Sequence, residues 1–376
     1  MIQNFVISLC RNLVSQKRIK NPKANFFGKI KICTMRTILH QLPSTFPAIA
    51  FFLLLNASSA QASGDKPSVF NTLTQAEGVK MTLDLDLTYL MENRKDVEYH
   101  TAALTLDESG KSYPVEVRVR GKFRRKNSEV PPLKIKFKKK ILAEEGLDTL
   151  NEMKLVLPAV DNSEGDELLL REYAAYRMYE KLSPYAIRAR LVRLTLRDTH
   201  NPKTKMTMYA LLLEDIEELC ARVNAKEVET FGIPTSSLEM ESAAMVTIFE
   251  YMIGNTDWDI SMMRNVKLIQ VAGQEKVITV PYDFDFSGLV GAPYATPSSD
   301  SGLRTVRDRF LMSSGIDPVA MEKAIVKMKS QKDDLFASCM IKTLNKASIS
   351  EMMAYLNTFY KAVENANSVP VMMKVE

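Results

Sequence analysis

The spacing of apolar residues changes along the chain, and this change limits the possible folds more than any other feature of the sequence. Between residues 80 and 214 many segments alternate apolar and polar residues, as in "YPVEVRVRG" (113–121) and "PPLKIKF" (131–137). A period of two is typical of strands with one buried face. From residue 215 onward apolar residues recur mainly at helical spacing. We therefore predict an α+β fold with two lobes and a cleft between them, the strand-rich lobe spanning 80–214 and the helical lobe 215–376.

Three further segments refine this pattern. Residues 166–182 have helical spacing with acids in the first turn, which interact favourably with a helix N-terminus. Residues 238–254 form a long apolar helix pattern that ends at Gly254, a residue suited to a helix C-cap. The segments "NVKLIQ" and "KVITV" follow it and predict a strand pair.

The N-terminus has the order of a secretory signal peptide. Met35 is followed by a cation, by the apolar core "AIAFFLLL" and by small residues that end at Ala62. We interpret 35–62 as a signal peptide cleaved near Ala62, which predicts export to the periplasm or the cell exterior and no membrane span in the mature chain. Residues 1–34 are interpreted as a non-native upstream leader, and 63–79 as a short exposed tether. The alternative is a basic leader with a membrane anchor, although the apolar core is shorter than the ~20 residues of a spanning helix.

The charge distribution argues against a nucleic-acid binder. Residues 1–62 carry eight Lys and Arg and no acid, so removing them from the 50 basic residues leaves 42 against 45 acidic ones. The formal charge then changes from +5 to −3, and the basic surplus that nucleic-acid binding needs is lost. The sequence does not determine an oligomeric state.

Histidine and cysteine are too scarce for several kinds of site. Only His100 and His200 follow residue 62, and neither lies in an acidic cluster, which argues against a His-ligated metal or a Ser-His-Asp hydrolase. Cys220 and Cys339 form no C-x-x-C motif, so a zinc or thioredoxin-type site is not predicted. They could form one disulfide or be two buried thiols.

Carboxylates cluster in two places that a strand pair connects. Asp257 follows the apolar helix in "GNTDW", and Asp283 and Asp285 follow the strand pattern in "VPYDFDFSG". Like charges on one face of a strand need water, a cation or a basic partner. Oxygen ligands without His or Cys favour Mg²⁺, Mn²⁺ or Ca²⁺ over zinc. Mg²⁺ bound by one or two carboxylates keeps positions for phosphate oxygens, as phosphoryl transfer requires. The alternative is an acidic turn that is paired with arginine.

Five blocks resemble the spore coat protein H (CotH) kinase-like family, in the same order, over residues 110–290. They are "VRVRGKFRR…PPLKIKF", "LLLREYAAYRMYEKL", "MYALLLEDIEEL", "GNTDWDISMMRNVKLI" and "VPYDFDFSG". The resemblance implies an exported atypical kinase with a two-lobed protein-kinase-like fold that uses ATP and Mg²⁺ or Mn²⁺ and transfers phosphate to a protein or envelope hydroxyl.

The resemblance also implies roles for individual residues. Asp257 matches the catalytic-loop acid, and Asp283 matches the metal-binding acid, with Asp285 beside it. Asn265 is a candidate second metal ligand, although it follows Asp257 by eight residues rather than the five usual in kinases. Glu214 is placed at the nucleotide-side hinge.

The nucleotide side departs from the family pattern. The usual R-G-N-S-S run is "RGKFRRKNSEVPP" here, so the phosphate-holding lysine is Lys134 or, as second choice, Lys154. Two alternatives to an active kinase therefore stay open. One is a catalytically inactive kinase-fold protein with a binding or envelope-structural role. The other is a haloacid-dehalogenase-type phosphatase, whose nucleophile motif also follows an apolar strand.

Overall fold

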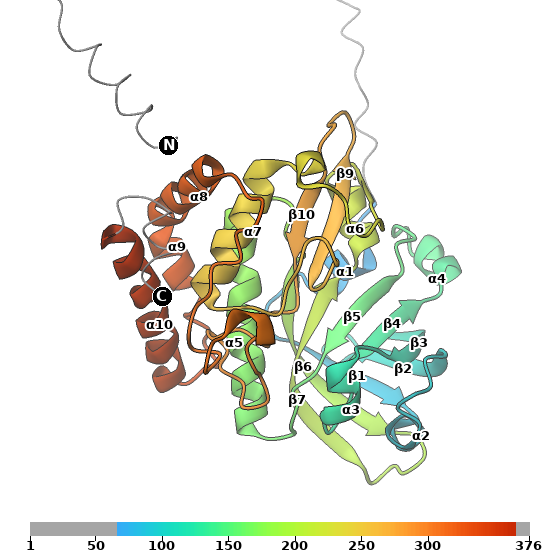
Figure 1. The fold of residues 1–376 in the computed structure, drawn as a ribbon. Helices are drawn as coiled ribbons and strands as arrows, with labels where there is room; N and C mark the ends of the chain where they lie inside the picture. The colour runs from blue at the N-terminus through green and yellow to red at the C-terminus, as the bar shows by residue number, and fades with distance from the viewer. Residues whose placement is uncertain (1–65, 366–376) are drawn as a thin grey trace, which may run out of the picture. The chain divides into compact units, whose positions relative to one another are not determined.

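A computed structural model describes residues 66–365 of the chain, and this part has an α+β fold (Figure 1). The predicted leader, the signal peptide, the first residues of the predicted tether and the last residues of the helical half lie outside the described residues. Within the described part, no helix is both long and apolar enough to cross a membrane.

The N-terminal half contains a closed barrel of seven strands, which the expected kinase-like arrangement does not include. Neighbouring strands pair antiparallel except β1 and β6, whose parallel pairing closes the barrel. In barrel order the strands are β1 (Val79–Leu85), β2 (His100–Leu106), β3 (Ser112–Val119), β4 (Leu133–Phe137), β5 (Glu152–Val156), β7 (Lys205–Glu214) and β6 (Ala189–Asp198). Alternation dictates the packing, since Leu133, Ile135 and Phe137 are buried while Lys134 and Lys136 lie on the other face.

Short helices connect or cover the barrel strands. They are α1 (Val69–Leu73), α2 (Leu87–Glu92), α3 (Phe123–Asn127) and α4 (Lys139–Glu144). Helix α1 corrects one expectation, because 63–79 was predicted to be an exposed tether. Val69, Phe70 and Leu73 are instead fully buried in the apolar core of the barrel.

The remaining elements share a second apolar core. Its helices are α5 (Ser163–Leu182), α6 (Ile216–Arg222), α7 (Met240–Ile253), α8 (Pro318–Ser330), α9 (Lys332–Ala337) and α10 (Lys346–Asn365), with short 3₁₀ helices η1 (Thr235–Ser237) and η2 (Ser299–Ser301). Strands β8 (Ala225–Glu227), β9 (Val266–Val271) and β10 (Ile278–Pro281) form an antiparallel sheet in the order β10-β9-β8.

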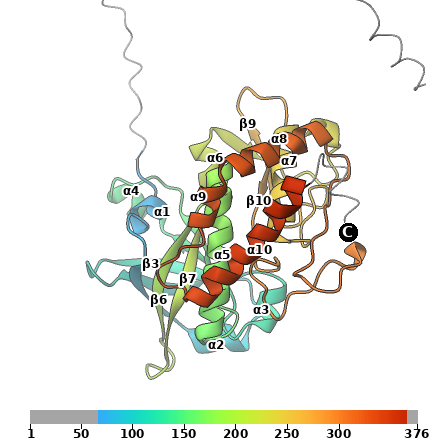
Figure 2. The ribbon, with the colours of Figure 1, turned by 90° about the vertical axis from the view of Figure 1, so that its left-hand side faces the viewer.

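Helix α5 connects the two cores. It packs on β6 and β7 of the barrel and also contacts α7, α9 and α10, as the two ribbon views show (Figures 1 and 2). The helix begins three residues before the predicted start because the Asn162 side chain accepts a hydrogen bond from the Gly165 N–H. Gly254 ends α7 in the predicted C-cap position with a φ of 67°.

The two cysteines that lie in the described part are free and buried. The structure therefore contains the buried thiols and not the disulfide of the two alternatives.

Candidate functional site

One cavity collects most of the predicted site residues. It has a volume of about 600 Å³. Most of its lining comes from three segments that are distant in the sequence, namely the turn after β3 with the start of α3, the loop after α7 and the loop after β10, and Pro132 and Phe231 complete it. The lining residues are Arg120, Gly121, Lys122, Phe123, Arg124, Pro132, Phe231, Asp257, Met262, Met263, Arg264, Asn265, Tyr282, Asp283, Asp285 and Phe286. The lining thus includes four of the predicted site residues, Asp257, Asn265, Asp283 and Asp285, which the sequence places at a common site.

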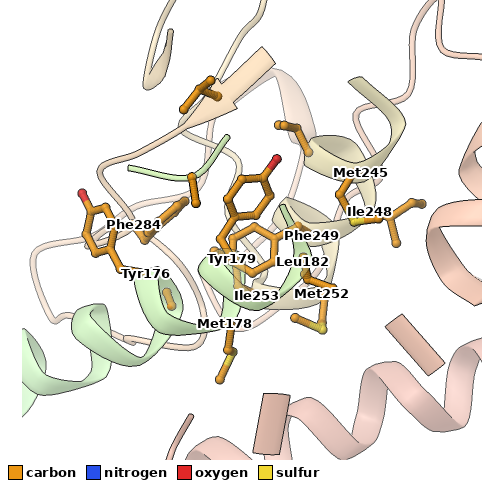
Figure 3. Close-up of a cluster of buried hydrophobic side chains, with 14 of the residues drawn as sticks. Tyr176, Met178, Tyr179, Leu182, Met245, Ile248, Phe249, Met252, Ile253 and Phe284 are labelled. Carbon is orange, nitrogen blue, oxygen red and sulfur yellow. The ribbon is translucent and has the colours of Figure 1, made fainter. Parts of the chain in front are cut away.

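A buried phenylalanine anchors the loop after β10. The Phe284 side chain is fully buried, and its ring lies 4.7 Å from the Tyr176 ring of α5 and 5.5 Å from the Phe249 ring of α7 (Figure 3). Burying this ring fixes the chain on both sides of it. Asp283 and Asp285 are thereby held one residue before and one residue after the anchor.

Asp283 has an unusual backbone conformation that α5 supports. Its φ is 69°, in the left-handed region, which Asp enters more readily than most residues but at some cost in energy. The Asp283 N–H donates a hydrogen bond of 2.9 Å to the hydroxyl of Tyr176. Asp283 is half-buried and lines the cavity, so its carboxylate is accessible from there.

Asp257 is held by its neighbours on both sides. The Asn255 side chain accepts a hydrogen bond from the Asp257 N–H at 2.9 Å. The Asn265 amide donates to the Asp257 carboxylate at 3.0 Å, so the two residues meet although eight positions separate them. The extra residues form a small turn that Asp259 and Arg264 close with two backbone hydrogen bonds of 2.9 Å.

Charge and burial compete at Asp257. Burial raises the pKa of its carboxyl, the Arg264 guanidinium opposes this, and the Asp283 carboxylate adds to the increase. The closest ion-pair contact joins Arg264 Nε to Asp257 Oδ1 at 3.6 Å. A carboxyl with a raised pKa is better suited to accept a proton than an exposed one.

Asp285 has a different environment from Asp283. It is 5% exposed, its Oδ2 lies 3.9 Å from Nε of Arg124, and it accepts a hydrogen bond of 3.2 Å from the Tyr294 hydroxyl. Burial, together with the Asp283 charge, raises the pKa of Asp285 to about 7. Both aspartates line the cavity, but Asp285 is buried against Arg124 and Tyr294, whereas Asp283 is half-buried.

The two candidate lysines have opposite surroundings. Lys134 forms ion pairs with Glu152 and, at 3.3 Å, with Asp215, so acids already neutralise its charge. Lys154 lies opposite Lys134 on the neighbouring strand. Its ammonium is 5.0 Å from the centre of the Tyr282 ring, which lines the cavity. Burial, with the nearby charge of Arg120, lowers the pKa of Lys154 to about 8.

Glu214 lies outside the lining of this cavity. It is fully buried at the end of β7. Its carboxylate accepts hydrogen bonds from Arg188 Nε and Arg222 Nε, each at 3.0 Å. These contacts describe a buried ion cluster that joins the barrel to α6.

Sequence reasoning missed three cations that line the cavity. Arg120, Lys122 and Arg124 line it from the turn after β3, where Gly121 has a φ of 82°. The signal was present in the run "RGKFRR", which concentrates four cations within six residues.

The acidic residues of the cavity could bind a metal ion only if water or phosphate oxygens completed its coordination. Within residues 66–365, no three or more His, Cys, Asp and Glu side chains are grouped so that they could hold an ion. Mg²⁺ usually takes one or two carboxylates and completes its coordination with water and phosphate oxygens. Asp283, with the Asn265 amide oxygen, fits that limited role, and the group does not fit a cage of many carboxylates.

Comparisons with known proteins add little to this geometry. No family model matches the chain, and no curated protein is similar to it. Among solved structures, the Helicobacter pylori proinflammatory kinase CtkA aligns over 59% of this chain and 90% of its own, with 7% identity and a TM-score of 0.34. At this TM-score the similarity is too weak to support an argument about fold or function.

Proposed function

We propose that this chain is an exported phosphotransferase. Its phosphate donor would be ATP, bound together with Mg²⁺ or Mn²⁺. The observation that supports the proposal is that carboxylates and cations line the same cavity of about 600 Å³. Asp257, Asp283 and Asn265 come from the segments that follow α7 and β10, and Arg120 and Lys122 come from the turn after β3. This volume is within the range of about 300–1,000 Å³ that is usual for small-molecule sites.

Phosphoryl transfer requires few covalent steps from the protein, and most of its catalysis comes from positioning and charge. In the proposed site Asp283 and Asn265 would hold the metal ion, which would neutralise phosphate oxygens. Arg120 and Lys122 would bind other phosphate oxygens, and Lys154 would approach past Tyr282. Asp257 would accept a hydrogen bond from the attacking hydroxyl and orient it. The acceptor class we propose is a protein or envelope hydroxyl.

The proposal includes a two-lobed kinase-like arrangement related to the CotH kinase-like family. The order of the five sequence blocks supports it, and so does the position of the cavity between the turn after β3 and the loops that follow α7 and β10. Export is proposed from the signal-peptide pattern alone.

Ligand-induced stabilisation of the full-length chain tests the proposal. A ligand that binds the folded state raises its stability by about 2.7 kcal/mol at a hundredfold excess over the dissociation constant. We expect Mn²⁺-ATP to raise the melting temperature of the unsubstituted chain and not that of Asp283→Asn. Asp300→Asn, which changes an exposed aspartate on η2, is the matched control and should respond like the unsubstituted chain. No increase in the unsubstituted chain would refute the proposal.

A catalytically inactive kinase-fold binding protein is the second candidate. The observation that favours it is the ion pair between Asp285 and Arg124. Because of this pair, only one of the two aspartates of the D-x-D motif is left to bind a metal ion. Incubation with γ-labelled ATP and Mn²⁺ separates the two candidates. Label on the protein that disappears in Asp257→Asn supports an enzyme, whereas nucleotide binding without any transfer supports the binding protein.

The phosphatase interpretation has less support. Strand β10, which precedes the D-x-D motif, pairs antiparallel with β9 in a three-stranded sheet. The phosphatase motif normally begins a parallel α/β domain. We therefore do not propose this activity.

A further inference from the structure

Three buried charged side chains meet beside the cavity. Arg124 comes from α3, Glu172 from α5 and Asp285 from the loop after β10. They are 9%, 1% and 5% exposed. Side chains from three separate elements thus bring two carboxylates and one guanidinium together with little access to water.

The guanidinium of Arg124 lies within reach of both carboxylates. Its Nη1 is 3.7 Å from Oε2 of Glu172, and its Nε is 3.9 Å from Oδ2 of Asp285. Two buried carboxylates this close to one centre repel each other, and either a bound proton or a cation between them relieves the repulsion. Arg124 supplies that cation, and a hydrogen bond from its Nη2 to the Leu157 carbonyl holds it in place.

The contacts between these groups are ionic and not hydrogen-bonded. Within the described part of the chain, Arg124 Nε and Glu172 Oε1 are both buried without a hydrogen-bond partner. A guanidinium normally forms short, paired hydrogen bonds with a carboxylate. Here the Arg124 guanidinium instead lies as a single positive charge between carboxylate oxygens of two different elements. Proteins commonly hold a metal ion between carboxylate oxygens in the same way.

Asp283 lies within electrostatic reach of all three charges, but in the described part of the chain it forms no ion pair with Arg124. The Phe284 ring anchors the loop between Asp283 and Asp285, and Asp283 is half-buried at the cavity while Asp285 is buried against Arg124. The two aspartates of the D-x-D motif therefore face different partners.

We propose that Arg124 is a tethered cation that takes the place of a divalent metal ion between Glu172 and Asp285. Metal binding in the cavity is then confined to Asp283 with Asn265, and Asp285 is not a metal ligand. The assignment of Asp283 rests on the proposed function. The role of Arg124 rests on the contacts of Glu172 and Asp285.

Removing the tethered cation should create a metal site. We expect the full-length Arg124→Ala variant to bind one more equivalent of Mn²⁺ than the unsubstituted chain, counted by electron paramagnetic resonance without nucleotide. The added equivalent should be lost in Arg124→Ala/Glu172→Gln. Arg124→Lys, which retains a cation, should bind as the unsubstituted chain does.

Stability provides a second readout that does not depend on activity. Arg124→Ala leaves two buried carboxylates without a cation and should melt at a lower temperature, and Mn²⁺ should restore part of the loss. A variant that binds no additional Mn²⁺, or that neither folds nor is rescued by Mn²⁺, overturns the inference. Failure of the unsubstituted chain to bind Mn²⁺-ATP would refute the proposed function instead, and it would leave the result for Arg124→Ala interpretable.

Discussion

Removing one hydroxyl group tests whether α5 holds Asp283 in its left-handed conformation. Tyr176→Phe keeps the buried ring that packs on Phe284, and removes only the acceptor of the 2.9 Å hydrogen bond from the Asp283 N–H. A net hydrogen bond contributes about 0.5–1.5 kcal/mol, and a buried donor left unpaired costs about 1–3 kcal/mol. We therefore expect the free energy of unfolding to fall by about 1–2 kcal/mol.

A matched control lies one helical turn further along α5. Tyr179 is also buried, and its ring packs 4.9 Å from that of Phe249. Its hydroxyl has no hydrogen-bond partner of normal geometry in the described part of the chain. Tyr179→Phe removes a buried polar group that forms no such bond, so we expect no loss of stability.

Urea unfolding of the two variants measures the difference. A true loss of stability shifts the midpoint and leaves the slope of the unfolding free energy against urea unchanged. Binding of Mn²⁺-ATP should weaken in Tyr176→Phe and not in Tyr179→Phe, because only the first loosens Asp283. Equal midpoint shifts in both variants would show that the Tyr176 hydroxyl does not support the loop, and the reasoning would be refuted.

Three further predictions follow from other contacts. Gly254→Ala should cost about 2–4 kcal/mol of stability by urea unfolding, because its φ of 67° disfavours a side chain and a Cβ would lie 1.9 Å from the Tyr355 hydroxyl. The control Gly273→Ala, with a φ of 79° and open space around it, should cost about 1 kcal/mol. Burial raises the pKa of Glu218 to about 7, so the folded chain keeps a proton that the unfolded chain loses near pH 4.5, and its free energy of unfolding should fall by roughly 2–3 kcal/mol between pH 5 and 8 relative to that of Glu218→Gln. A difference between the two chains that does not change with pH would contradict this. Lys154→Met should stabilise the fold by on the order of 1 kcal/mol at pH 7 and weaken nucleotide binding. Lys134→Met should destabilise the fold, because it removes the cation beside Asp215 and leaves Glu152 with only the more distant Lys136, and calorimetry that shows the reverse order for nucleotide affinity would favour Lys134 as the phosphate ligand.

Much of the local structure follows from the sequence. Strand β4 is predictable because alternation places Leu133, Ile135 and Phe137 on one face, and α7 is predictable because its apolar run ends at a glycine. The common location of Asp257 and Asp283 is also predictable, since a single strand pair separates the loops that carry them. These features depend on residues that are near one another in the chain.

Other features depend on segments that meet only in the folded protein. Parallel pairing of β1 with β6, which closes the barrel, joins residues more than a hundred positions apart. Lys134 and Lys154 are equivalent in pattern, and only their partners, two acids for one and the Tyr282 ring for the other, distinguish them. The pairing of Arg124 with Glu172 and Asp285 has the same origin. Periodicity along the chain determines which face of an element is buried, but the tertiary structure alone decides which distant side chain lies opposite and therefore which charges remain available to a ligand.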